Sequence, residues 1–177
     1  NIDAIASLHA AGDLGVPLVV LGTANYDSPV TAAIAALADS TDQVRMLGHV
    51  GDRNAFFDLV HHARVYVHGH SVGGTNPSLV EAMGVGARIV AYDTAFSRET
   101  LGDAAEYFVL DQDSYAGAVR NVLADSAPVD EKVRLEITAR GAELYSKESV
   151  VGAYRDLLAA SARGGRVTIR TRWASPE

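Results

Sequence analysis

The chain alternates five short apolar runs with longer segments of helical periodicity, and this alternation restricts its fold more than any other feature. The runs cover residues 16–21, 43–47, 64–68, 88–92 and 106–110. Several are almost continuous in Val, Ile and Leu, a pattern typical of strands that are covered on both faces. Strands that alternate with helices predict right-handed crossovers and a parallel sheet. We therefore expect an α/β fold with a Rossmann-like, doubly wound parallel sheet.

Between these runs, several helices carry recognisable start signals. Ser28-Pro29 is a plausible cap and first position for a helix with apolar residues at 30, 34 and 37. We expect Asp52 or Asn54 to open the next helix, and Ser114 to open the one that follows the last strand. Residues 130–162 predict one long helix or two, with Gly141 and Gly152 as candidate breaks.

One domain, residues 1–162, and a short tail account for the length of 177 residues. The sequence begins in a helical pattern, whereas a doubly wound domain normally opens on a strand. We therefore expect the first strand, and a whole preceding domain, to be missing from this sequence. Residues 163–177 contain four Arg and one Glu, which predicts a flexible basic tail able to contact anionic lipid or a partner.

The overall charge and composition exclude several classes of protein. A net charge of −7 argues against a general nucleic-acid-binding surface. No apolar stretch approaches the roughly 20 residues of a membrane-spanning helix, and the first residues lack the basic start of a signal peptide. The chain has no cysteine, so it has neither disulfides nor thiolate metal sites, and a cytoplasmic location is expected.

The strongest local feature lies after the third apolar run, where the sequence reads Gly73-Gly74-Thr75-Asn76-Pro77. Ligands of open parallel sheets bind beyond the carboxyl ends of the strands. Two glycines let the backbone approach a ligand closely, while Asn76 suits the cap and Pro77 the first position of a helix. Free N–H groups at such a helix start attract anions. The loop therefore predicts a phosphate site.

Glu81 is the one acidic residue between His70 and Arg88, and the pattern places it just over one turn inside the helix. Its small neighbours leave room for a ligand to reach the carboxylate, which can accept hydrogen bonds from the paired hydroxyls of a sugar. The simpler interpretation is a solvated surface carboxylate. The sequence favours the ligand-binding role because the glycine loop precedes it.

Four histidines, His61, His62, His68 and His70, invite a metal hypothesis, since His68 and His70 share one face of an extended segment. Zinc sites usually add Cys or carboxylate ligands and a defined second set of hydrogen bonds. We therefore favour hydrogen-bonded loop residues, and expect His70 near a bound sugar. Asp93 and the pair Arg98-Glu99 could border the same cleft; the alternative is a helix cap and a surface ion pair.

The segment GGTNPSLVEAMGVGARIVAYD, residues 73–93, resembles the signature of GT-B glycosyltransferases, especially the large retaining family four. That signature has two Glu eight residues apart, then Ala-Met and a Gly-x-x-Val-Val strand. Glu81 matches its second Glu, and Ala82-Met83 follow. The sequence of residues 68–83 is most similar to that of a bacterial, rhamnosyltransferase-like branch. The resemblance extends from residue 1 to about residue 158.

This resemblance implies that the chain is the C-terminal, donor-binding half of a GT-B fold. Glu81 would hold the ribose of a nucleoside diphosphate sugar, while Gly73, Gly74, Thr75, Asn76 and His70 would face the donor sugar and diphosphate. It also implies hexosyl or deoxyhexosyl transfer to a glycan or lipid-linked acceptor in polysaccharide biosynthesis, at the inner face of the membrane. The acceptor would bind through the missing N-terminal domain, so we expect little catalysis from the isolated chain.

One departure from the family pattern leaves the chemistry open. Gly73 stands where the first signature Glu is expected; Asn76 or Thr75 could substitute for it. No residue stands out as a covalent nucleophile, so the catalytic residues stay unassigned. GT-B enzymes resemble one another in needing no metal, so the resemblance implies no cofactor.

Two other functions remain as alternatives. The departure at Gly73 permits a non-catalytic nucleotide-binding or regulatory module of the same fold. A nicotinamide-dependent oxidoreductase is weaker, because no Gly-x-Gly-x-x-Gly follows the first apolar run.

Overall fold

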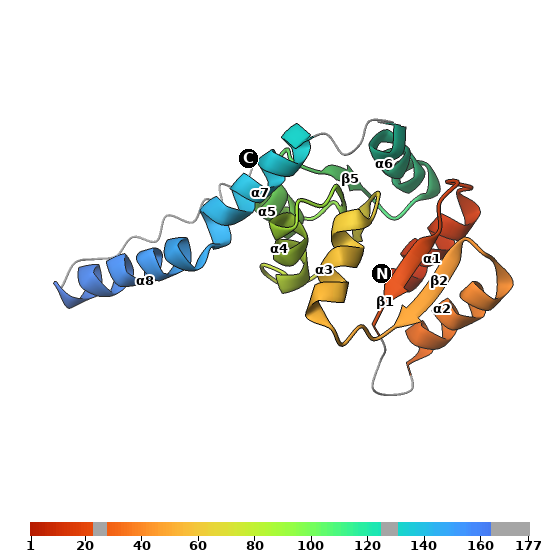
Figure 1. Cartoon of the computed structure of the whole chain (residues 1–177), viewed down its shortest axis with the longest axis horizontal. Helices are drawn as coiled ribbons and strands as arrows, with labels where there is room; N and C mark the ends of the chain where they lie inside the picture. Colours follow the sequence, from red (N-terminus) through yellow and green to blue (C-terminus); the bar gives the residue numbers. More distant parts are fainter. Residues whose placement is uncertain (23–27, 125–130, 164–177) are drawn as a thin grey trace.

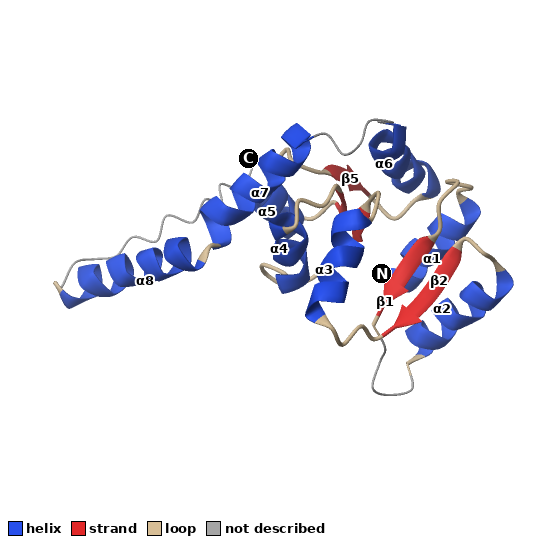
Figure 2. Cartoon of the chain, in the orientation of Figure 1, coloured by secondary structure: helices blue, strands red, loops and turns tan. Residues whose placement is uncertain are grey.

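The computed structural model describes residues 1–22, 28–124 and 131–163. Every one of the five predicted strands is present (Figure 1). They are β1 (Leu18–Leu21), β2 (Val44–Gly48), β3 (Tyr66–His68), β4 (Ile89–Tyr92) and β5 (Glu106–Phe108). The helices are α1 (Ile2–Ala11), α2 (Pro29–Ser40), α3 (Arg53–His62), α4 (Pro77–Gly84), α5 (Ala95–Leu101), α6 (Gln112–Ala124), α7 (Glu131–Tyr145) and α8 (Lys147–Ala162), and Figure 2 shows how they surround the strands.

All strand pairs are parallel, which confirms the predicted α/β fold. The sheet is nevertheless divided, because β1 pairs with β2 while β3, β4 and β5 form a second sheet in that order. The sequence predicts a single sheet. It could not predict the division, because the periodicity of a strand does not indicate which strand lies beside it. A cleft separates β1 from β3.

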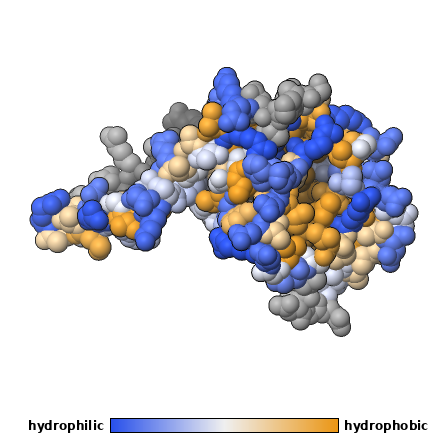
Figure 3. Space-filling view, in the orientation of Figure 1, coloured by the Kyte–Doolittle hydropathy of each residue, from blue (hydrophilic) through white to orange (hydrophobic). Residues whose placement is uncertain are grey.

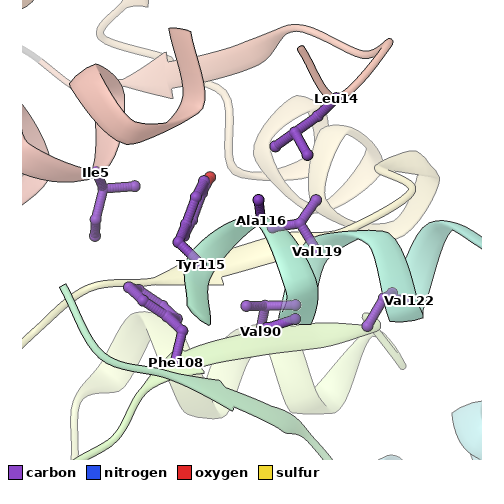
Figure 4. Close-up of a cluster of buried hydrophobic side chains, with 9 residues drawn as sticks. Ile5, Leu14, Val90, Phe108, Tyr115, Ala116, Val119 and Val122 are labelled. Atoms are coloured by element: carbon purple, nitrogen blue, oxygen red, sulfur yellow. The ribbon is translucent and has the colours of Figure 1, made fainter. Parts of the chain in front are cut away.

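Two layers of apolar side chains cover the larger sheet. Val90 and Phe108 pack with Ile5 of α1 and with Tyr115 and Val119 of α6 (Figure 4). The alternate residues Ile89 and Ala91 face the other side and pack against side chains of α4 and α7. Such alternation between two covered faces explains why β4 is almost wholly apolar.

The smaller sheet has its own core. Val20 of β1 and Val44 of β2 pack with Ala6 of α1 and Ile34 of α2. Because α1 contributes Ile5 to the core of the larger sheet and Ala6 to that of the smaller one, it links the two sheets.

Helix starts agree with the sequence at some positions and differ at others. Asp52 caps α3, accepting hydrogen bonds from the backbone of Asn54 and Ala55. The prediction that Ser114 opens α6 is wrong, because that helix begins at Gln112. Asp111 supplies the cap there, its carboxylate accepting from the Ser114 N–H at 2.8 Å. The overlooked signal was Asp111, three residues before Ser114, which is the spacing of a helix cap and its partner.

The C-terminal helical region divides at Ser146, and neither Gly141 nor Gly152 breaks it. Ser146 has an extended backbone and its hydroxyl accepts from the Ser149 N–H, so it caps α8. α8 has no buried residue and extends away from the body of the molecule (Figure 1). The predicted flexible tail lies, from residue 164 onward, outside the described residues. None of the described helices is long and apolar enough to cross a membrane.

Gly141 has a packing role, which suggests a test. A Cβ atom there would lie 3.3 Å from the Met83 Cβ of α4, so a large side chain would push α7 away from α4. We expect Gly141→Leu to lower the free energy of unfolding by about 1–3 kcal/mol, measured by urea denaturation. Gly152→Leu on α8 is the matched control, because no atom lies within 4 Å of its added Cβ. Equal stabilities of the two variants would contradict this packing role.

Candidate functional site

The loop that leads into α4 has the form predicted from its sequence. Asn76 is the cap residue and Pro77 the first residue of the helix. The Asn76 side-chain oxygen accepts from the Ser78 N–H at 3.0 Å and from the Ser78 hydroxyl at 2.7 Å. Gly73 has φ +113°, a left-handed value that favours glycine. Nothing lies within 4 Å of a Cβ added at Gly73 or Gly74, so a ligand can approach this backbone.

A small pocket lies between this loop, the end of β3 and the start of α5. It brings together four of the six predicted donor-binding residues, namely His70, Gly73, Gly74 and Asn76. Thr75 and Glu81 are not among its lining residues. Thr75 is exposed in the same loop, and Glu81 lies one turn further along α4.

The other wall of the pocket comes from the segment after β4, with Thr94, Phe96, Ser97 and Thr100. Thr94 caps α5, its hydroxyl oxygen accepting from the Ser97 N–H at 3.0 Å. Sequence reasoning placed Asp93 at this edge but missed Ser97 and Thr100, which are 2% and 3% exposed. The signal for Ser97 was its spacing from Thr94, which is that of a helix cap and its partner.

Glu81 forms an ion pair that the sequence did not predict. The Arg53 Nη2 atom, at the first residue of α3, lies 2.8 Å from Glu81 Oε1. The Arg53 side chain is 72% exposed and that of Glu81 is 30% exposed. Exposed pairs of this kind contribute about 0–1 kcal/mol to stability, so a ligand can displace Arg53 from the carboxylate at small cost. Arg53 follows the second strand and so lies at the same edge of the sheet as Glu81, but no sequence pattern pairs the two residues.

Three rings follow one another along β3 toward the pocket. Tyr66 and His68 stack with ring centroids 6.4 Å apart, and His68 and His70 stack at 4.8 Å. The Tyr66 hydroxyl donates to the Ser78 hydroxyl at 3.3 Å. Burial raises the pKa of Tyr66, and the nearby Glu81 charge adds to that shift. The row links the strand to the start of α4.

His68 is the ring whose burial shifts its pKa strongly. It is 3% exposed, and burial, with the neighbouring His70, lowers its pKa to about 4. Its Nδ1 atom is buried and has no hydrogen-bond partner among the described residues. His68 is therefore uncharged at neutral pH.

The histidines do not assemble into a metal site in the part of the chain that the structure describes. No group of three or more His, Asp or Glu side chains there could hold a metal ion. His61 instead lies 2.9 Å, through Nδ1, from the Val85 carbonyl oxygen, and Arg134 Nη1 lies 2.8 Å from the same nitrogen. It shares a ring contact with His62, whereas His68 stacks on His70.

Asp93 and Arg98 pair with each other at the carboxyl end of β4. Arg98 donates from Nε and Nη2 to the two carboxylate oxygens, at 2.5 and 2.7 Å. The hydrogen bonds from Arg98 lower the pKa of Asp93. The Arg98 guanidinium also lies 4.2 Å from the centre of the Tyr107 ring. The cap role that the sequence left open for Asp93 belongs to Thr94.

The fold matches solved structures of GT-B glycosyltransferases. HepE of Anabaena in complex with UDP superposes with a TM-score of 0.73 at 14% identity, over 89% of this chain and 44% of that one. AviGT4, a glycosyltransferase of avilamycin A biosynthesis, gives 0.61 at 21% identity, over 89% and 47%. Sucrose-phosphate synthase from Thermosynechococcus elongatus gives 0.69 at 20% identity, over 90% and 44%. The chain therefore spans less than half the length of each of these structures.

No curated protein matches this sequence. The family model described as "Glycosyl transferases group 1" matches residues 1–125, which include both strands of the smaller sheet, all of the larger sheet and the pocket. The structural likeness shows a GT-B fold, and the family match shows that the chain belongs to the group 1 glycosyl transferases.

Proposed function

We propose that this chain binds a nucleoside diphosphate sugar and is the donor-binding part of a glycosyltransferase. The observation that carries the proposal is the sequence of features along one short stretch: an open glycine loop, a capped helix start and, one turn inside, the partly exposed Glu81. Helix starts favour anions, and a carboxylate favours paired hydroxyls. Together they match the diphosphate and the ribose of one ligand.

Each predicted residue has a role in this proposal. Glu81 accepts hydrogen bonds from the ribose hydroxyls once Arg53 is displaced. The N–H groups of Gly74 and Thr75 face the diphosphate, and the dipole of α4 adds to the attraction. His70, Gly73 and Asn76 border the sugar. The UDP and UDP-glucose complexes of HepE support this class of ligand.

The reaction itself is a proposal for the whole protein. Transfer would proceed with retention, from a hexosyl or deoxyhexosyl donor of the rhamnosyltransferase-like type, to a glycan or lipid-linked acceptor bound elsewhere in the protein. A cytoplasmic location would suit such a donor. The start of α4 stabilises the leaving diphosphate electrostatically, so the reaction requires no metal. No residue is assigned as nucleophile, because Gly73 occupies the position of the first signature Glu.

Ligand binding tests the proposal directly. We expect UDP, ADP, GDP or dTDP to raise the melting temperature with EDTA present, and a concentration of 100 Kd to add about 2.7 kcal/mol to the free energy of unfolding. Thermal scans of this chain with each nucleotide, and with pyrophosphate as control, measure the effect. No shift at millimolar nucleotide, or an equal shift with pyrophosphate, would contradict the proposed site.

The full-length protein separates the two remaining alternatives. Release of the nucleoside diphosphate from its sugar in the presence of acceptor would support the transferase, and the anomeric configuration of the product, read by NMR, would test retention. Tight nucleotide binding without any transfer would support the non-catalytic module.

A further inference from the structure

A large cleft lies between the two sheets. It has a volume of about 1360 Å³ and is lined by β1, β3 and the facing sides of α1, α3 and α6. Apolar side chains dominate its walls, among them Ile5, Val19, Leu59, Val67 and Val119. Hydrophobic atoms gather between α3 and β1 (Figure 3). Val19 is 45% exposed, although a strand of a doubly wound sheet is normally covered.

Backbone groups on the β1 side of the cleft point into it. The Leu18 N–H donates to the Gln43 carbonyl and the Gly22 N–H to the Gly48 carbonyl, each at 2.8 Å. Alternate residues of a parallel strand bond to opposite neighbours. Since Leu18 and Gly22 bond toward β2, the backbone N–H and C=O groups of Val19 and Leu21 face away from β2, toward the cleft.

The β3 side presents the same arrangement. The Tyr66 N–H donates to the Arg88 carbonyl at 2.8 Å, at the start of the pairing with β4. By the same alternation, the backbone groups of Val65 and Val67 face the cleft. Two open strand edges therefore face each other across an apolar space, and backbone groups in such surroundings require hydrogen-bond partners.

The strand order indicates how many strands would fit between β1 and β3. The observed order is β2-β1, a break, then β3-β4-β5. A doubly wound sheet of the order 3-2-1-4-5-6 has one strand at that break. A single strand placed about 4.8 Å from each edge satisfies both rows of backbone groups, whereas a helix offers no free backbone groups to pair with them.

We propose that this cleft binds one extended, apolar peptide segment, which lies parallel to β1 and β3 and joins the two sheets into one. Side chains on one face of the segment would contact α1 and α6, and those on the other face would contact α3. Val, Ile and Leu on both faces suit such a position. This inference concerns the sheet and does not depend on the proposed ligand.

The position of Asn1 makes the proposal testable within one molecule. The Asn1 Nδ2 atom donates to the Gly69 carbonyl at 3.0 Å, beyond the carboxyl end of β3. A parallel segment would also end at this edge, so a short linker can join it to Asn1. The linkage gives the segment a high effective concentration at the cleft.

The experiment compares this chain with a version that carries, ahead of Asn1, about five alternating Val and Ile residues and a short Gly-Ser linker. Amide hydrogen exchange is read by NMR at single residues. We expect exchange at Val19 and Val67 to slow about tenfold or more relative to Leu18 and Tyr66. The latter two are internal controls, because their N–H groups already donate within the sheets.

A version with Ser in place of every Val and Ile of the added segment is the matched control, and should leave exchange at Val19 and Val67 unchanged. Equal slowing by this control, or no slowing by the apolar segment, would overturn the proposal. Protection of Val19 and Val67 that grows with the concentration of the unextended chain would assign the cleft to a second copy and overturn it as well.

Discussion

Replacing Glu81 by Gln is expected to weaken nucleoside diphosphate binding about tenfold to one hundredfold. A hydrogen bond to a charged acceptor contributes about 1.5–3 kcal/mol, and the neutral amide keeps the shape of the side chain but loses the charge. Isothermal titration of the purified variant measures the dissociation constant. The fold should be unaffected, because the exposed pair with Arg53 contributes about 0–1 kcal/mol.

Two comparisons make this result specific to the ribose. Uridine, which keeps the ribose and lacks the phosphates, should lose affinity by the same factor as UDP. Glu143→Gln, an exposed carboxylate on α7, is the matched control and should bind like the unmodified chain. If Glu81→Gln binds both ligands with unchanged affinity, the carboxylate is only a surface partner of Arg53.

Acidification is expected to destabilise the fold through its buried histidines. His68 has a pKa of about 4 when folded, against 6.5 when unfolded. Below pH 6.5 the unfolded chain therefore binds a proton that the folded chain does not, and stability falls as the pH drops toward 4. This difference corresponds to about 3 kcal/mol for His68. Burial also lowers the pKa of His9, which acts in the same direction.

Urea denaturation at a series of pH values between 7 and 4 measures this loss. His68→Phe replaces the ring by an apolar one of similar size, and should flatten the profile between pH 6.5 and 4. Chemical shifts of the His68 ring protons should report titration near pH 4 in the folded chain. A His68→Phe profile that follows that of the unmodified chain would contradict the assignment to His68.

Local features of this fold could be predicted from the sequence, because local chemistry produces them. The five strands follow from short apolar runs, and the start of α4 follows from Asn76 and Pro77, whose side chains act within one turn. The carboxyl edge of the sheet collects His70 and Gly73 because parallel strands end together.

Features that depend on distant partners could not be predicted in the same way. Arg53 and Glu81 are 28 residues apart, and no sequence period relates a residue of α3 to one of α4. The division of the sheet depends on which edges meet in space, and strand periodicity contains no such information. The helix break at Ser146 was missed because glycine was taken as the breaker, whereas Gly141 is held inside a helix by its contact with Met83.

That contact has a consequence for the way this chain can vary in evolution. Met83 is two residues from Glu81, and its Cβ atom lies 3.3 Å from the position of a Cβ added at residue 141. Every residue except glycine has that Cβ, so a larger residue at 141 requires α7 to move away from α4 even when a shorter side chain stands at 83. A helix outside the proposed donor site thereby limits how far α4, which carries Glu81, can shift.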